Sequence, residues 1–148
     1  NNVKIQMIGD TKKLPKETLE ALERAEEMTQ LNTGLILNFA LNYGGRAEIT
    51  QAVKQITHEV LDAKFSPEDI TEEMIADYLY TESLPRVLRD PDLIIRTSGE
   101  IRLSNFLPWQ AAYSELYFTD VMWPDFGEEA LRSAIVEYSH RHRRFGGV

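Results

Sequence analysis

Two spacings of apolar residues alternate along the chain, and this alternation constrains the fold more than any other feature. Short runs typical of β-strands occupy residues 3–9, 35–42, 92–97 and 115–119. Between and after these runs, apolar residues recur every three or four positions, as they do on one face of a helix. Parallel strands joined by helices produce this order. The sequence therefore predicts an α/β fold with a mostly parallel sheet flanked by helices.

Apolar stripes locate the first two helices. Within residues 15–30, one helical stripe is formed by Leu19, Leu22, Ala25 and Met28, and Pro15 is acceptable in the first turn. A second stripe runs from Ile49 to Val60 through Val53 and Ile56, and it starts just after a pair of glycines. The strand at 35–42 between these helices carries no charge, as expected when both of its faces are covered.

Two further helices follow, and their first residues are less certain from the sequence. The third could be capped by Ser66, which precedes a proline, or by Thr71, and the sequence does not choose between them. The last has Asp125 and Glu128 at the spacing of a capping box. We expect this last helix to bury an apolar stripe of Leu131, Ile135 and Tyr138.

Composition limits the class of protein. The 148 residues carry a formal net charge of −8, which repels a nucleic-acid backbone and offers an anionic membrane no broad basic face. No cysteine is present for disulfide or thiolate chemistry, and the first residues do not resemble a signal peptide. The uncharged stretch at 31–45 is too short to span a bilayer. These features favour a cytoplasmic protein that does not bind nucleic acid.

The stretch IIRTSGEIRLSNF, residues 94–106, concentrates positive charge and hydroxyls. Arg96 ends a predicted parallel strand, where open α/β sheets bind ligands. If the following segment is extended, Arg102 and Ser104 face the same side and the Leu103 amide can donate between them. Such a group suits a diphosphate. Alternatively, the arginines pair with nearby acids, and spacing leaves both interpretations open; the candidates are Asp90, Asp92 and Glu100.

Three segments together resemble one family. They are PDLIIRTSGEIRLSNFLPWQAAYSELYFTDVMWPDF at 91–126, NYGGR at 42–46 and RRFGG at 143–147. The chain resembles the cis-prenyltransferases, and most closely the bacterial undecaprenyl diphosphate synthases among them. The resemblance implies the α/β fold of that family and not the all-helical fold of the trans-prenyltransferases.

The resemblance also implies a substrate site and a metal. Arg96, Arg102 and Ser104, with the Leu103 backbone, would bind isopentenyl diphosphate, and Glu115 would help to bind Mg²⁺ at the diphosphate. Glu100 also matches an acid of the family, which leaves open whether it contacts metal or an arginine.

The end of the chain and the NYGGR segment each have two interpretations. In the family, an arginine and a glycine near the carboxyl end enter the partner's site, so Arg144 and Gly146 imply a homodimer with shared sites. Alternatively, the basic residues around Arg144 form a solvated helix end. The glycines of residues 42–46 either permit a tight turn or line a cleft near a helix N-terminus.

One expected segment is not found. Members of the family begin with a segment resembling His-x-Asp-Gly-Asn-Gly-Arg, whose aspartate is the principal metal ligand and whose loop holds the allylic diphosphate. We therefore expect residues 1–148 to be the C-terminal portion of a single domain that is inactive alone, and we assign no catalytic residue.

For the whole protein, the resemblance implies condensation of isopentenyl diphosphate with an allylic prenyl diphosphate to give a long-chain cis-polyprenyl diphosphate, the undecaprenyl lipid carrier. Membrane contact would be peripheral, through the lipid product. The alternatives are a noncatalytic dimerisation or accessory subunit and a fragment that retains only the isopentenyl diphosphate site.

Overall fold

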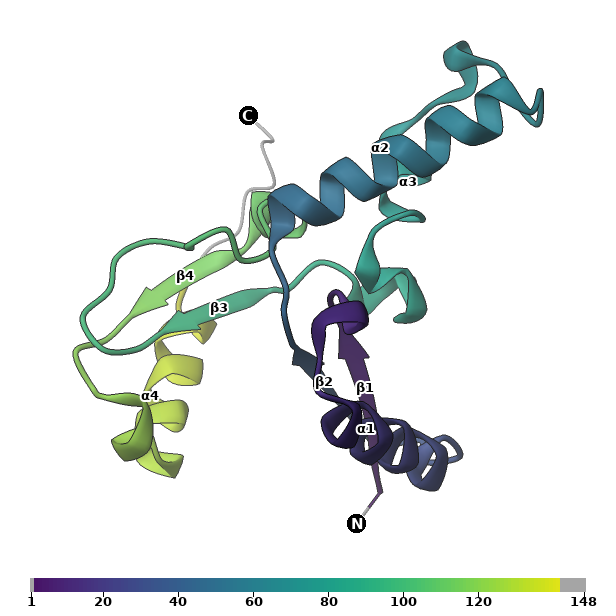
Figure 1. The fold of residues 1–148 in the computed structure, drawn as a ribbon. Coiled ribbons are helices and arrows are strands. Elements are labelled where there is room, and N and C mark those ends of the chain that lie inside the picture. Colours follow the sequence, from purple (N-terminus) through teal and green to yellow (C-terminus); the bar gives the residue numbers. More distant parts are fainter. Residues whose placement is uncertain (1, 142–148) are drawn as a thin grey trace. The chain divides into compact units, whose positions relative to one another are not determined.

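The computed structural model describes residues 2–141. The chain forms two compact units, Asn1–Ser83 and Leu84–Val148, and each is described by itself. Within the described residues, the two pairs of parallel strands and the helices that flank them confirm the predicted α/β class (Figure 1). No helix in this part of the chain is both long and apolar enough to cross a membrane.

The first unit is built on a parallel pair of strands. β1 (Val3–Ile8) pairs with β2 (Leu35–Ala40) in a register that matches their first residues and their last. α1 (Lys16–Thr29) joins the two strands and packs along β1, with the Ile5 amide donating to Thr29 Oγ1 at 3.0 Å. The hydrogen bond ties the last turn of α1 to the middle of the strand. The predicted strands and helix are therefore present, with ends shifted by one or two residues. Met28, which was expected on the apolar stripe of this helix, is instead 79% exposed.

One face of β2 differs from the prediction. Its low charge suggested a strand covered on both sides, yet Leu35 is 67% exposed and Leu37 and Phe39 are 42% and 40% exposed. These side chains alternate with half-buried ones, so they share one face of the pair. This face of β2 is therefore only partly covered within the described residues.

α2 (Gly45–Leu61) begins at the glycine pair, as predicted, but the stripe it buries is different. Glu48, Ala52 and Ile56 are buried, while Val53 is 54% exposed. The buried stripe is rotated because Glu48 accepts hydrogen bonds from two neighbouring segments, described below, and so faces the core.

The two candidate caps of the third helix both act as caps, each for its own element. Ser66 precedes the 3₁₀ turn Pro67–Asp69, and the Ser66 amide donates to Asp69 Oδ2 at 2.8 Å. Thr71 caps α3 (Glu72–Ala76) and accepts from the Met74 amide at 3.1 Å. Because α3 is only five residues long, the core residue Leu79 lies beyond its end.

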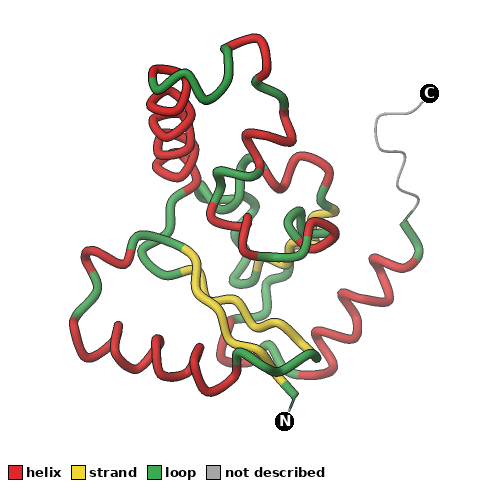
Figure 2. The backbone as a smooth tube through the Cα atoms, turned by 90° about the vertical axis from the view of Figure 1, so that its right-hand side faces the viewer, coloured by secondary structure: helices red, strands yellow, loops and turns green. Residues whose placement is uncertain are grey.

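The second unit repeats the parallel arrangement with shorter strands. β3 (Leu93–Arg96) pairs with β4 (Glu115–Phe118), and α4 (Glu128–Ser139) packs against β4. The connection between the strands is mainly a long loop with a 3₁₀ turn at Gln110–Tyr113. Figure 2 shows the strands in yellow, the helices in red and the loops in green. The predicted strands are again confirmed.

The predicted start of the last helix is wrong. Asp125 ends a separate 3₁₀ turn, Trp123–Asp125, and α4 begins at Glu128 behind Gly127, with no side-chain cap. A turn therefore occupies the residues that were expected to form a capping box.

The predicted burial along this helix is also wrong for two of three residues. Leu131 and Ile135 are 43% and 51% exposed, whereas Ala134 is fully buried and Tyr138 is half-buried. The residue that faces the inside is small, which lets the helix approach closely and leaves its larger neighbours at the sides.

Candidate functional site

Arg96 lies at the carboxyl end of β3, where sequence analysis placed it. Its carbonyl accepts from the Thr119 amide at 3.0 Å, so the backbone is fixed to the end of β4. Its side chain is half-buried, and among residues 2–141 its guanidinium makes no hydrogen bond or ion pair. The alternative in which Arg96 pairs with a nearby acid is therefore not what the structure contains. A partly desolvated cation without an internal partner favours an external anion.

The turn after Arg96 is held in a defined shape. Ser98 and Gly99 have left-handed backbones with φ of 66° and 70°. Their amides donate to Val121 and Thr119 carbonyls at 2.9 and 3.0 Å. A left-handed pair reverses the chain direction. The turn is thereby attached to the segment that follows β4 and stays close to the strand end that carries Arg96.

Residues 102–104, the RLS loop, differ from the extended form considered above. Arg102 forms an ion pair with Glu100, so the acid whose role was open contacts an arginine. The Leu103 amide donates no hydrogen bond within the described residues, while its carbonyl accepts from the Phe106 amide at 3.0 Å. Ser104 has a φ of 49° and begins a turn, so alternation along a strand does not decide where its side chain points.

Positive φ angles are concentrated in this loop. Besides Gly99, four residues adopt them: Ser98, Ser104, Asn105 and Leu107. Asparagine enters this region fairly readily, whereas a serine or leucine there costs on the order of 1 kcal/mol and is retained where surrounding contacts fix it, often at functional sites. Sequence reasoning missed Leu107 because a leucine gives no signal for a left-handed backbone.

Glu115 is not placed beside Arg96. It opens β4 opposite Leu93, whereas Arg96 is opposite Phe118. Three residues of a strand separate the two levels by about 10 Å. The odd separation also puts the side chains on opposite faces of the pair, because successive residues alternate. Within one chain, the structure therefore leaves Glu115 at the opposite end of the strand pair from Arg96.

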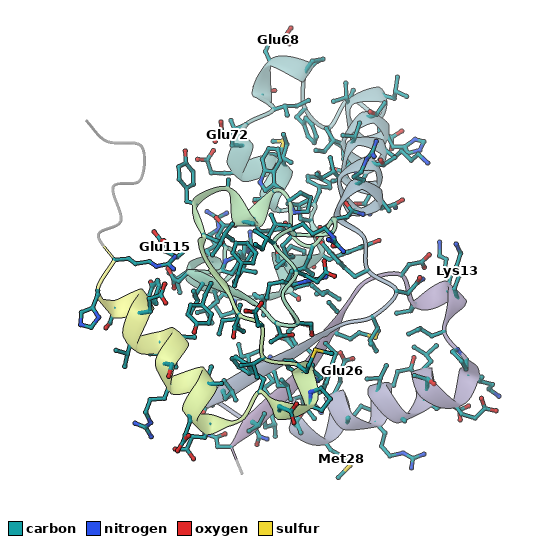
Figure 3. All side chains as sticks on the ribbon, turned by 90° about the vertical axis from the view of Figure 1, so that its left-hand side faces the viewer. Lys13, Glu26, Met28, Glu68, Glu72 and Glu115 are labelled. Atoms are coloured by element: carbon teal, nitrogen blue, oxygen red, sulfur yellow. The ribbon has the colours of Figure 1, made fainter. Side chains whose placement is uncertain are left out.

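Glu115 instead contacts the end of α4 (Figure 3). Arg141 Nη1 lies 2.9 Å from Glu115 Oε2 and 2.8 Å from the Leu116 carbonyl oxygen, and Arg141 Nη2 lies 2.5 Å from Glu137 Oε1. The hydrogen bonds to Glu137 and Glu115 hold the pKa of Arg141 above its ordinary value. The predicted tail residues Arg144 and Gly146 lie outside the described residues.

A carboxylate such as Glu115 suits a hard dication, but only as one ligand. Its Oε1 accepts no hydrogen bond within residues 2–141, and its side chain is 27% exposed. The described residues contain no group of three acidic or histidine side chains that could hold a metal. Mg²⁺ commonly uses one or two carboxylates together with water and substrate phosphates. Glu115 fits that kind of site and would need other oxygens to complete it.

The first unit contains a polar cavity of about 690 Å³ at the carboxyl ends of β1 and β2. Asn42 and Gly44 of the NYGGR segment line it, and Asn42 Nδ2 donates to the Asp10 carbonyl at 2.9 Å. Nearby, a Cβ on Gly9 would lie 1.9 Å from the Leu41 carbonyl oxygen, so this turn requires glycine. Asn42 and Gly44 thus line a cavity, as one interpretation of NYGGR predicted. Gly44 itself has an extended backbone with a φ of −157°, and the left-handed residue of the segment is Asn42, with a φ of 47°.

Glu48 is a buried acid that sequence reasoning missed. Its side chain is 1% exposed and accepts from Tyr43 Oη at 2.5 Å and from the Tyr80 amide at 2.6 Å. These bonds fix the NYGGR turn against the segment after α3. Burial, Asp10 and Glu48 together raise the pKa of Tyr80. A glutamate is rarely buried, so no pattern pointed to it.

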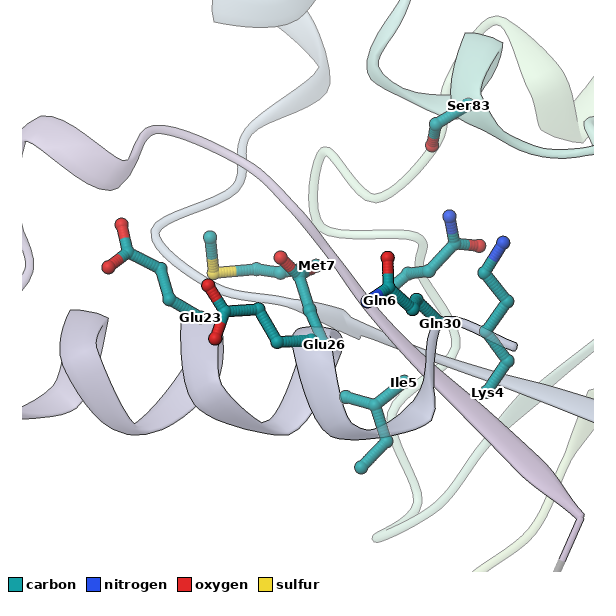
Figure 4. A pocket seen from close by; sticks show the side chains of 9 residues that line it. Lys4, Ile5, Gln6, Met7, Glu23, Glu26, Gln30 and Ser83 are labelled. Atoms are coloured by element: carbon teal, nitrogen blue, oxygen red, sulfur yellow. The ribbon is translucent and has the colours of Figure 1, made fainter. Parts of the chain in front are cut away.

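A second hollow of about 500 Å³ lies beside β1 and α1 (Figure 4). Three glutamates from α1 line it opposite β1 residues that include Lys4 and Gln6. A solvated acidic helix face accounts for this composition.

The comparisons with known proteins agree with this geometry. A family model described as "Putative undecaprenyl diphosphate synthase" matches residues 1–146. Isoprenyl transferases of Streptococcus pneumoniae and Streptococcus mutans are 74% and 72% identical over all 148 residues. The chain belongs to this family of cis-prenyltransferases.

Solved structures share the fold. Lavandulyl diphosphate synthase from Lavandula x intermedia, in complex with dimethylallyl diphosphate, is 39% identical with a TM-score of 0.94, over 97% of this chain and 60% of that one. A probable undecaprenyl diphosphate synthase from Campylobacter jejuni is 35% identical with a TM-score of 0.81, over 99% and 64%. The chain spans 59% of the length of the two streptococcal relatives.

Proposed function

We propose that the full-length protein condenses isopentenyl diphosphate with an allylic prenyl diphosphate and builds a long-chain cis-polyprenyl diphosphate, the undecaprenyl lipid carrier used in cell-wall synthesis. The observation that carries the proposal is the half-buried guanidinium of Arg96, which has no partner among the described residues and stands at a strand end. The family and the strong identity to isoprenyl transferases support it. The reaction takes place at the cytoplasmic side, where the lipid product provides the membrane contact.

Arg96, Arg102, the Leu103 amide and Ser104 bind the isopentenyl diphosphate in this proposal. Guanidinium groups suit a diphosphate because their charge is permanent and their hydrogen-bond donors are arranged as a fork. Each charge-assisted hydrogen bond contributes about 1.5–3 kcal/mol, so three such bonds support micromolar binding before ordering costs. Glu100 keeps Arg102 paired and must share or release it when the diphosphate binds.

Glu115 contributes one ligand to Mg²⁺ in this proposal. The metal spreads the negative charge of a diphosphate and so favours its departure from the allylic carbon. Because Glu115 lies at the opposite end and face of the strand pair from Arg96, it serves a diphosphate held by a second subunit. Arg144 and Gly146 act across the same homodimer. Residues 1–148 alone do not elongate a prenyl chain, because the allylic site of the family is formed elsewhere in the protein.

Calorimetric titration of isopentenyl diphosphate into the full-length protein tests this function, together with a radiolabelled elongation assay. We expect Arg102→Ala to weaken binding at least tenfold. Glu100→Gln is the matched variant, because it frees Arg102 from its ion pair and is expected to leave binding equal or tighter. Equal binding by wild type and Arg102→Ala would contradict the assigned acceptor site, and an absence of elongated product would contradict the reaction itself.

A further inference from the structure

Arg141 joins the start of β4 to the end of α4 through three hydrogen bonds. Nη1 donates both to Glu115 Oε2 and to the backbone carbonyl of Leu116, at 2.9 and 2.8 Å. Nη2 donates to Glu137, one helical turn earlier, at 2.5 Å. The Leu116 carbonyl belongs to the strand backbone and cannot move independently, so the guanidinium has a fixed position relative to β4.

The contacts leave the two oxygens of Glu115 in different states. Oε2 is held by Arg141, while Oε1 accepts no hydrogen bond within the described residues. Both side chains are little more than a quarter exposed, at 27% and 28%, so water competes less than at a surface pair. A carboxylate already held in one rotamer loses less conformational freedom when it binds a cation.

We infer that Arg141 is a positioning residue: it orients Glu115 so that Oε1 is presented to a divalent cation, and it ties this carboxylate to the end of α4, from which the chain continues to Arg144 and Gly146. The inference rests on the metal role proposed for Glu115.

Charge alone predicts the opposite effect. A guanidinium next to a metal ligand repels the metal, so if Arg141 acted only through its charge, its removal would tighten divalent-cation binding. If Arg141 acts by orienting Glu115, its removal weakens binding, because residues that orient metal ligands typically change affinity by about 10–100-fold. The two explanations differ in the sign of one measurement.

The experiment is a titration of the full-length protein with Mn²⁺, followed by electron paramagnetic resonance. We expect Arg141→Met to raise the dissociation constant of Mn²⁺ about tenfold or more. Arg132→Met is the control, because Arg132 forms a similar pair with Glu128 on the same helix, at 2.9 Å and well exposed; it should leave Mn²⁺ affinity unchanged. Unchanged or tighter binding by Arg141→Met would overturn the inference.

Two milder variants keep the test decisive if Arg141→Met does not fold. Arg141→Lys keeps the charge but cannot make the forked contacts, and Glu137→Gln weakens the support of Nη2. Both are expected to weaken Mn²⁺ binding several-fold, and wild-type affinity in both would refute the positioning role. Elongation by each variant should recover at high Mg²⁺, which would not happen if the fold were damaged.

Glu115→Gln distinguishes a failure of the metal role of Glu115 from a failure of the positioning role of Arg141. If it leaves Mn²⁺ affinity unchanged, the proposed metal role of Glu115 fails and the positioning role fails with it. If Glu115→Gln weakens binding while the Arg141 variants do not, only the positioning role fails.

Discussion

Replacing Arg96 by methionine should separate binding from stability. In most proteins, removing a half-buried arginine leaves an acid without its partner and lowers stability. Arg96 has no acid partner within residues 2–141, so the substitution leaves no acid there without its partner. It removes an uncompensated cation and keeps most of the apolar stem, and we expect the free energy of unfolding to stay equal or rise slightly.

The effect on ligand binding should be large. Loss of one charge-assisted hydrogen bond costs about 1.5–3 kcal/mol, which corresponds to about 10- to 150-fold in affinity. If the guanidinium binds two diphosphate oxygens, as its fork allows, the loss approaches the square of that factor. Arg96→Lys keeps the charge and one donor direction and should fall between wild type and Arg96→Met.

The assay combines calorimetry with isopentenyl diphosphate and urea unfolding of the same preparations of the full-length protein. We expect weak binding and undiminished stability for Arg96→Met. The reverse result, with affinity retained and the unfolding free energy lowered by more than about 1 kcal/mol, would show that Arg96 has a structural partner and would refute its role as an anion receptor.

Three further substitutions test the local structure by urea unfolding of the full-length protein. Glu48→Gln should lower the free energy of unfolding by about 1–3 kcal/mol, because an amide NH₂ replaces one of the two carboxylate oxygens and then faces a hydrogen-bond donor. An unchanged free energy of unfolding would contradict the buried network. Gly9→Ala should cost about 2 kcal/mol or more because its Cβ would meet the Leu41 carbonyl, and wild-type stability would rule out that approach. Thr71→Ala should cost about 1 kcal/mol through loss of the Met74 amide bond, and an unchanged midpoint would show that α3 does not need this cap.

Much of the fold could be predicted because it depends on local patterns. Strands and long helices follow from apolar spacing, and Arg96 follows from being at the end of a strand. Burial could not be predicted where it depends on neighbouring elements. Val53 and Leu131 have the spacing of core residues, yet the structure turns Glu48 and Ala134 inward instead. A stripe fixes which residues share a face, while tertiary contacts decide which face is covered.

The candidate site shows the same limit more sharply. The resemblance implied that Arg96 binds a diphosphate and that Glu115 helps to bind Mg²⁺ at that diphosphate. Their separation depends on the register of β3 with β4, which places Glu115 opposite Leu93 and on the other face from Arg96. No local pattern encodes that register across an intervening loop of eighteen residues, 97–114.

The register has a consequence for how the two groups could work together. Arg96 lies at the carboxyl end of β3, and Glu115 with Arg141 forms a second group at the amino end of β4. The two groups lie on opposite faces of the strand pair and about 10 Å apart along the strands, so a single bound diphosphate is too short to contact both. If both serve the same reaction, each active site must take one group from each of two chains. Mixed dimers test this requirement: a chain with Arg96→Met and a chain with Glu115→Gln should together regain one intact site, and elongation no greater than that of either variant alone would contradict sharing between subunits.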